Sequence, residues 1–416
     1  MRFETVNFPE FASSYVENYE TTKDHPRAVA FEKAMEQLVE SYPEDSEAAI
    51  FFAMALNGTA DLTDKTYGQP LRAAKILEAA LEAQPNHPGI AHYIIHSYDV
   101  PSLAKHALPA ARRYAGIAPA APHALHMPSH TFTRLGHWQE SIDTNLRSAD
   151  AAMAAGSPSE ALHAIDYMAY AYLQTGQDAA AAGTLTRAAE VFTQVASNDR
   201  YIVAGAFAAA AVPTRFALER GDWAAATQVP TVESPAPFVD AIVDFAHGIG
   251  AARTQDLEGG SAAVAKLKAT EEKLHKNAYW AGRVAIQRTI VEAWLQHGGD
   301  DQAAALSTMQ RAVELENATE KSAISPGPLA PAGEQLGELL LELGRPGDAL
   351  NVFRTAVEKE PGRLRGIYGA ALAAKGAGQA DVAQEYFLRL VTICKDGDEE
   401  RPELVRARAY LAASVN

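Results

Sequence analysis

One spacing in the C-terminal part of the chain constrains the fold more than any other feature. Gly344 and Gly378 are 34 residues apart, and Ala349 and Ala383 repeat the same interval. Each glycine closes a segment whose apolar residues recur at helical spacing, and a second helical segment centred on the alanine follows it. Pro361 follows the second helix of the first pair. The pattern predicts pairs of antiparallel helices joined by short turns.

A period of 34 residues is that of the tetratricopeptide repeat (TPR). Looser copies of the Gly-turn pattern occur at Gly136, Gly176, Gly221 and Gly298, and the interval of 40 residues between the first two shows that the repeats are not uniform. Each pair leaves an apolar face that only a neighbouring pair can cover. We therefore expect an all-α protein, a right-handed α-solenoid of TPR-like helix-turn-helix repeats.

Two segments break the helical pattern. Residues 227–238 are rich in Pro, Ser and Thr, and residues 318–333 are rich in Pro and Gly, so both are expected to be loops. The first loop predicts an N-terminal TPR-like half, residues 1–226, and a C-terminal TPR-like half, residues 239–416. Stacked repeats need no flexible linker, so we expect the two halves to form one continuous solenoid.

Composition excludes several functions. The formal charge of −16 and the pI of about 5.3 argue against nucleic acid and anionic membrane as partners. The single cysteine, Cys394, excludes a disulfide within the chain and a zinc site of several thiolates, and its apolar surroundings predict a buried thiol. The N-terminal sequence has no apolar core segment, and no run of about 18 apolar residues occurs, so we expect a cytoplasmic protein without a membrane span.

Histidines are crowded in one region, because nine of the thirteen lie between residues 87 and 163. In the string HYIIHSYD, His92, His96 and Asp99 are separated by four and three residues. On a helix these positions fall within about 60° of one another, so the string predicts a chelating face of two imidazoles and a carboxylate.

A second string, PHALHMPSH, contains His123, His126 and His130. Pro128 lies among them and cannot donate a backbone hydrogen bond, which leaves two alternatives. The helix is kinked at Pro128, or a new helix begins near it and leaves His123 and His126 on the preceding loop. In both cases we expect the three imidazoles to converge.

A third string, ALHAIDYMAYAYL, contains His163 and Asp166, followed by Tyr167 and Tyr170. Corresponding helices of adjacent repeats lie side by side, about 10 Å apart. The three strings are therefore predicted to line one patch of the concave wall. The predicted metal ligands are His92, His96, Asp99, His123, His126, His130, His163 and Asp166.

Imidazole and carboxylate ligands without thiolate suit Zn, Fe(II), Mn, Ni or Cu(II), and we expect iron or zinc first and copper next. The predicted catalytic residues are Asp99, Tyr98 and Tyr167, in a metal-dependent hydrolase or oxidase acting on a small molecule or peptide. Two alternatives stay open. One is a metal-free scaffold that binds a peptide in its concave groove, and the other is a metal store or sensor without turnover. The sequence does not decide whether the chain forms a homo-oligomer.

Weaker candidates lie outside the histidine strings. The polar segment from Asp61 to Tyr67 and the acidic Glu47 are expected to cap helices, with contact to the site as the alternative. Lys321 and the loop after it could cover the site. No Gly-x-Ser-x-Gly, P-loop or dinucleotide-binding motif is present, so serine hydrolase, nucleotide hydrolase and dehydrogenase functions lack support.

The combination of HYIIHSYD with HALHMPSH, together with PGPLAPAGEQLGELLLELGRPGDAL near the C-terminus, resembles a family of bacterial tetratricopeptide-repeat proteins. The resemblance covers most of residues 45–380. It implies the all-helical fold and implies no particular reaction. The residues that match its histidine motifs are His92, His96, Asp99, His123, His126 and His130.

Overall fold

The computed structural model describes residues 24–61, 63–318 and 320–414, and the N-terminal segment discussed above lies outside them. The chain forms two compact units, Met1–Pro119 and Ala120–Asn416, which are described separately below. The loop at residues 227–238, at which we predicted a boundary, lies inside the second unit. Within the described ranges the regular structure is entirely helical, which confirms the predicted all-α class.

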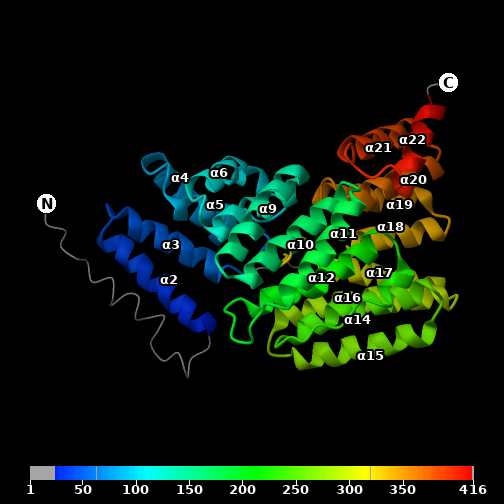
Figure 1. Cartoon of the computed structure of the whole chain (residues 1–416), viewed down its shortest axis with the longest axis horizontal. Helices are drawn as coiled ribbons and strands as arrows, with labels where there is room; N and C mark the ends of the chain where they lie inside the picture. Colours follow the sequence, from blue (N-terminus) through cyan, green and yellow to red (C-terminus); the bar gives the residue numbers. More distant parts are fainter. Residues whose placement is uncertain (1–23, 62, 319, 415–416) are drawn as a thin grey trace. The chain divides into compact units, whose positions relative to one another are not determined.

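The first unit consists of helices that each contact the next one along the chain. They are α2 (Asp24–Ser41), α3 (Ser46–Thr59), α4 (Gly68–Ala83), α5 (Pro88–Ser97) and α6 (Ala104–Ile117) (Figure 1). Helix α3 also contacts α5, as the first helices of successive repeats do. Leu38, Leu56, Leu77 and Ile94 meet in the core of this unit, and each is at most 2% exposed.

The second unit begins with short helices and continues in antiparallel pairs. Its helices are α7 (Pro122–His126), α8 (Pro128–Leu135), α9 (Trp138–Ala154), α10 (Pro158–Gln174), α11 (Asp178–Phe192), α12 (Ile202–Glu219), α13 (Trp223–Ala226), α14 (Pro237–Arg253), α15 (Leu257–Lys273), α16 (Ala278–Gly298), α17 (Gln302–Asn317), α18 (Ala332–Glu342), α19 (Pro346–Lys359), α20 (Leu364–Gly376), α21 (Ala380–Ile393) and α22 (Pro402–Ala413).

The stacking within the second unit is that of TPR-like repeats. Helices α10, α12, α14, α16, α18 and α20 form one series in which each contacts the next, and each also contacts the helix that follows it in sequence (Figure 1). The turn glycines confirm the predicted period, because Gly344 and Gly378 have φ of 68° and 73°, in the left-handed region that favours glycine. Ala349 and Ala383, the repeated alanines, are both fully buried.

The last repeats of the second unit pack back against its early helices. Helix α20 contacts α10. Arg363, just before α20, donates to Tyr170 Oη at 2.6 Å and to Glu219 Oε1 at 2.8 Å. Trp138 Nε1 donates to the carbonyl of Gly362 at 2.9 Å. The last repeats of this unit therefore contact its early helices directly.

The predicted loop between α17 and α18 is confirmed, and its residues 320–331, named here the inner loop, are held by a buried arginine. Arg215 of α12 donates to Ser325 Oγ at 2.9 Å, to the Gly327 carbonyl at 3.0 Å and to the Pro328 carbonyl at 3.2 Å. Its Nε donates to Asp166 Oδ1 of α10 at 2.7 Å. Both charged side chains are fully buried, so the pair fastens the inner loop to two neighbouring helices.

Two further expectations have clear outcomes. Cys394 is fully buried, and burial raises the pKa of its thiol to about 12, so the thiol has no thiolate character.

One described helix, α12, is long and apolar enough to span a membrane by length and composition alone. However, 67% of its span is buried against the rest of the protein, and it carries Arg215 and Glu219, as suits a core helix.

Candidate metal centre

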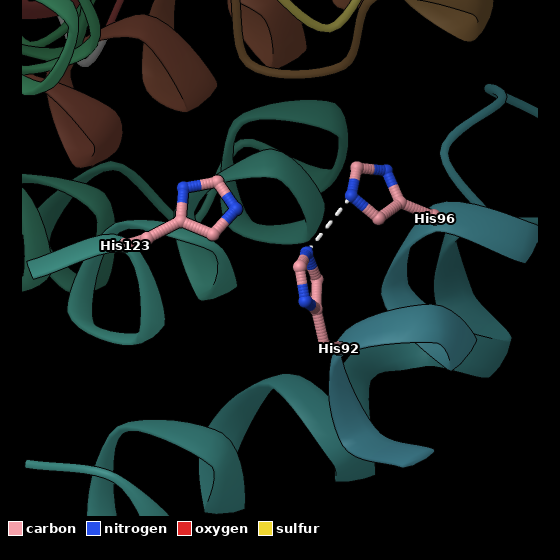
Figure 2. Close-up of side chains that lie close together, drawn as sticks. All are labelled: His92, His96 and His123. Atoms are coloured by element: carbon pink, nitrogen blue, oxygen red, sulfur yellow. Dashed lines mark hydrogen bonds between the residues drawn. The ribbon is translucent and has the colours of Figure 1, made fainter. Parts of the chain in front are cut away.

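Two histidines of the first unit form a close pair on α5. The ring nitrogens His92 Nε2 and His96 Nε2 are 3.0 Å apart, as the spacing of four residues predicts (Figure 2). His92 also stacks on Tyr93 and Tyr114, with ring centroids at 5.2 and 5.8 Å. The two imidazoles therefore face each other on a partly buried helix surface.

Asp99 does not lie on this helix. We predicted that it shares a helical face with His92 and His96, but α5 ends at Ser97 and Tyr98 is its C-cap residue. The residue before a proline avoids the helical region, and Pro101 follows directly after Val100, so the chain leaves the helix here. The helical argument that made Asp99 a ligand is wrong.

Tyr98, a predicted catalytic residue, belongs to the core of the first unit. It is 6% exposed, and its hydroxyl donates to Glu78 Oε1 at 2.7 Å. Burial and the neighbouring carboxylate raise the pKa of Tyr98 to about 12. These contacts place Tyr98 in the core of the first unit, and its catalytic role stays a prediction.

In the second unit, Pro128 begins a new helix. Helix α7 ends at His126, Met127 keeps helical angles, and α8 starts with Pro128 at its first position. The amide of His130 bonds the carbonyl of Met127, three residues back, because proline interrupts the regular ladder. His123 and His126 are therefore helical, not on a loop, and His126 and His130 still face each other across one turn.

Three histidines from three helices meet in this unit. His126 of α7, His130 of α8 and His163 of α10 each offer a ring nitrogen, and these nitrogens all lie within 4.8 Å of one another. We call this group the three-histidine cluster. His126 and His130 are 2% and 1% exposed, and His163 is partly exposed. Tyr167 lies one turn after His163 and contacts all three rings, with centroid distances of 4.7 to 5.3 Å.

The hydrogen bonds around His126 determine which of its nitrogens carries hydrogen. Asn145 Nδ2, on α9, donates to the Ser141 carbonyl at 2.7 Å, which leaves Asn145 Oδ1 as an acceptor. His126 Nδ1 lies 2.7 Å from this oxygen and must donate to it. In the neutral ring the hydrogen is then on Nδ1, so Nε2 has a lone pair.

His130 has two possible hydrogen positions, Nδ1 and Nε2. The Tyr167 hydroxyl has one hydrogen, and its acceptors are the carbonyls of Ala323 at 2.9 Å and Ser325 at 3.2 Å. His130 Nδ1 lies 3.4 Å from the same oxygen. With its hydrogen on Nε2, His130 donates to His126 Nε2, 3.0 Å away, and with its hydrogen on Nδ1 the two Nε2 atoms point lone pairs at each other. A cation bound between the two rings would accept both lone pairs in that second form.

A proton is a poor candidate for this cation. Burial lowers the pKa of His126 well below its ordinary value, and the neighbouring His163 and His123 lower it further. Burial also lowers the pKa of His163 to about 3, and His130, His123 and Lys321 add to the effect. The Nδ1 of His163 is buried without a hydrogen-bond partner among the described residues. Burial thus favours the neutral form of His126 and of His163, and the neutral imidazole is the form that binds a metal.

Asp166 has another role than the predicted one. It lies on α10 three residues after His163, but its carboxylate pairs with Arg215 instead of joining the cluster. His123 precedes His126 by one turn, with ring centroids 6.2 Å apart, and is more exposed. The second unit therefore brings together His126, His130, His163 and Tyr167 of the predicted set.

Sequence reasoning missed the residues that support the cluster. Asn145 lies in the middle of an amphipathic helix, where nothing in its spacing points to His126. The sequence does contain a sign that Arg215 has a specific partner, because it is the one cationic residue in the apolar helix IVAGAFAAAAVPTRFALE. Buried charge is rare without a partner, so such a residue indicates a specific contact.

Comparisons with known proteins give no closer identity. No protein-family model and no curated protein matches the chain. Among solved structures, yeast Tom70 is 10% identical, with 98% of this chain and 96% of that chain covered and a TM-score of 0.34. Human IFIT1, in a dimer with PPP-AAAA, is 11% identical, with 92% and 82% covered and a TM-score of 0.44. The TPR domain of P58(IPK) is 14% identical, with 89% and 99% covered and a TM-score of 0.26. The TPR-like assignment is therefore carried by the helix pairs themselves.

Proposed function

We propose that this chain is a metal-binding TPR-like protein and that the three-histidine cluster holds a divalent transition metal. The observation that carries the proposal is the pair of facing Nε2 atoms of His126 and His130, 3.0 Å apart, with Asn145 holding the hydrogen of His126 on the far side of its ring. Two ligands at about 2.1 Å from one ion lie about 3.0 Å apart at a right angle and about 3.4 Å apart in a tetrahedron. The separation thus suits a shared ion.

The donor set narrows the choice of ion. Three neutral imidazoles without thiolate suit iron or zinc first and copper next. Asn145 and Tyr167 would orient His126 and His130 through their Nδ1 atoms, as partners outside the ligand set do in known metal sites. When bound, an ion with three protein ligands keeps a position for water or substrate and supplies Lewis-acid or redox chemistry there.

The identity of the metal separates the two reaction classes. Zinc has no redox chemistry, so a zinc site favours hydrolysis by an activated water. Iron in a histidine site favours oxidation. The pair His92 and His96 in the first unit has the same Nε2 separation, and we propose it as a second, weaker binding position.

Metal analysis of tag-free protein tests the proposal. The protein is stripped with chelator, reloaded separately with Zn²⁺ or anaerobic Fe²⁺, dialysed and analysed by plasma mass spectrometry. We expect at least about one equivalent per chain, and loss of about one equivalent in the double variant His126→Ala/His163→Ala. His275→Ala is the matched control, because His275 is an exposed histidine remote from the cluster in sequence. Wild-type protein that retains no metal would favour the metal-free scaffold, and full retention in the double variant would reject the ligand assignment.

A further inference from the structure

A cavity between three successive helices and the inner loop shares no residue with the histidine cluster. Its walls come from α17, α18 and α19 and from two prolines of the inner loop, so it belongs entirely to the second unit. The cavity has a volume of about 240 Å³, and its lining is exposed at Asn317 and Thr355. We call it the Glu316 pocket. Its apolar walls are formed by Val313, Pro328, Pro331, Leu336, Val352 and Ala356.

A glycine keeps part of the Glu316 pocket open. Gly333 lies in the first turn of α18 and does not have the positive φ that would require glycine. A Cβ atom at this position would meet only Ala356 Cβ, at 3.6 Å, which is ordinary van der Waals contact. A larger side chain at position 333 would therefore fit the backbone and fill the pocket.

Glu316 places a buried carboxylate in this pocket without an ion-pair partner. It is 7% exposed, and its Oε1 accepts from the amide of Ala332 at 3.1 Å. Among the described residues, none forms an ion pair with Glu316, and none donates a hydrogen bond to its Oε2. Burial raises the pKa of Glu316, and the positive charges of Arg283 and Lys359 offset only part of that effect. A cation that enters the pocket would stabilise the ionised carboxylate.

A second carboxylate adds to the negative charge. Glu360 also lines the pocket, it forms no ion pair within the described part of the chain, and its charge raises the pKa of Glu316 further. Glu334 differs, because its two oxygens accept from Arg363 at 2.7 and 2.8 Å. Two of the three carboxylates in the lining are therefore available to a ligand.

The cation of the lining does not neutralise these two carboxylates. Lys359 Nζ donates to Asn317 Oδ1 at 3.0 Å, and it forms no ion pair with any described residue. A metal ion is a poor occupant, because no three ligand atoms that lie within 4.8 Å of one another in the described ranges include a carboxylate oxygen. An organic cation suits the pocket better, since it can contact a carboxylate and the apolar walls together.

From this arrangement we infer that the Glu316 pocket binds a small organic amine, a primary ammonium group attached to an apolar body. The ammonium donates to Glu316 Oε2 and lies in the negative field of Glu360, and the apolar body packs against the aliphatic walls. A cavity of about 150 Å³ holds benzene, so this volume suits a ligand of about ten non-hydrogen atoms. The inference does not depend on the metal, because it rests on a different set of side chains.

Calorimetric titration of the full chain with 3-phenylpropylamine tests the inference. We expect saturable binding, weakened at least tenfold when the uncharged 3-phenylpropan-1-ol replaces the amine. Glu316→Gln keeps the shape of the side chain and should weaken binding of the amine at least tenfold, with little effect on the alcohol. Glu314→Gln removes the same charge from an exposed site on the same helix and should leave binding unchanged.

A filled pocket gives an independent check. Gly333→Leu should abolish binding of both compounds, and its helical position makes loss of the fold unexpected. Three results would overturn the inference: no saturable heat with the amine at millimolar concentration, equal affinity of wild-type protein for amine and alcohol, and unchanged binding in Gly333→Leu. The comparison of amine and alcohol needs no variant, so the test stands even if Glu316→Gln fails to fold.

Discussion

Lowering the pH should destabilise the second unit through the buried histidines. The pKa of His163 is about 3 in the folded protein, because of burial, and about 6.5 in an unfolded chain. This depressed pKa means that the unfolded state binds the proton first as the pH falls. The stabilisation is complete above about pH 6.5 and is lost progressively between pH 6.5 and 3.

The magnitude follows from the two values. At pH 5 the pH lies about 1.5 units below the pKa of about 6.5 that the histidine has in the unfolded chain. Protonation there lowers the free energy of the unfolded state by about 2 kcal/mol, whereas folded His163, with a pKa of about 3, stays unprotonated. His163→Gln removes the titrating group. Between pH 7.5 and 5.0 the variant should therefore lose about 2 kcal/mol less of its free energy of unfolding than the wild type does.

Tryptophan fluorescence in urea is a suitable assay, because all four tryptophans lie in the second unit. The protein must be freed of metal by chelation, since a bound ion competes with protons. His275→Gln, an exposed histidine of the same unit, is the control and should keep the pH dependence of the wild type. Equal losses of stability in wild type and His163→Gln would refute the reasoning.

Two further predictions concern the partners of the cluster. Asn145→Ala removes the acceptor for His126 Nδ1 and should lower metal affinity about 10- to 100-fold in competition with a chromophoric chelator, whereas Asn145→Asp should retain affinity. An unchanged affinity in Asn145→Ala would contradict the orienting role. Arg215→Met leaves the buried Asp166 unpaired and should cost about 3–5 kcal/mol in urea unfolding, much of it recovered in Arg215→Met/Asp166→Leu. A loss below about 1 kcal/mol would show that the ion pair does not hold the inner loop.

Local patterns in the sequence were sufficient for the helices and for part of the site. The interval between Gly344 and Gly378 correctly predicted the helix pairs, because left-handed turn residues and helical periodicity depend on neighbours along the chain. Spacing also predicted that His92 faces His96 and that His126 faces His130, since residues four apart share a helical face. The prediction that Asp99 shares a helical face with His92 and His96 is wrong, because the helix ends at Ser97, ahead of Pro101.

Tertiary contacts decided the rest. Spacing cannot show that Asp166 turns to Arg215 or that Asn145 supports His126, because these partners are 49 and 19 residues apart and meet only when helices stack. By itself, the sequence determined where helices form and which histidines face each other within one turn. The tertiary structure decided which polar groups become partners. A buried charge or lone pair needs an ion-pair or hydrogen-bond partner, and the packing of the helices around the inner loop determines which group lies within reach.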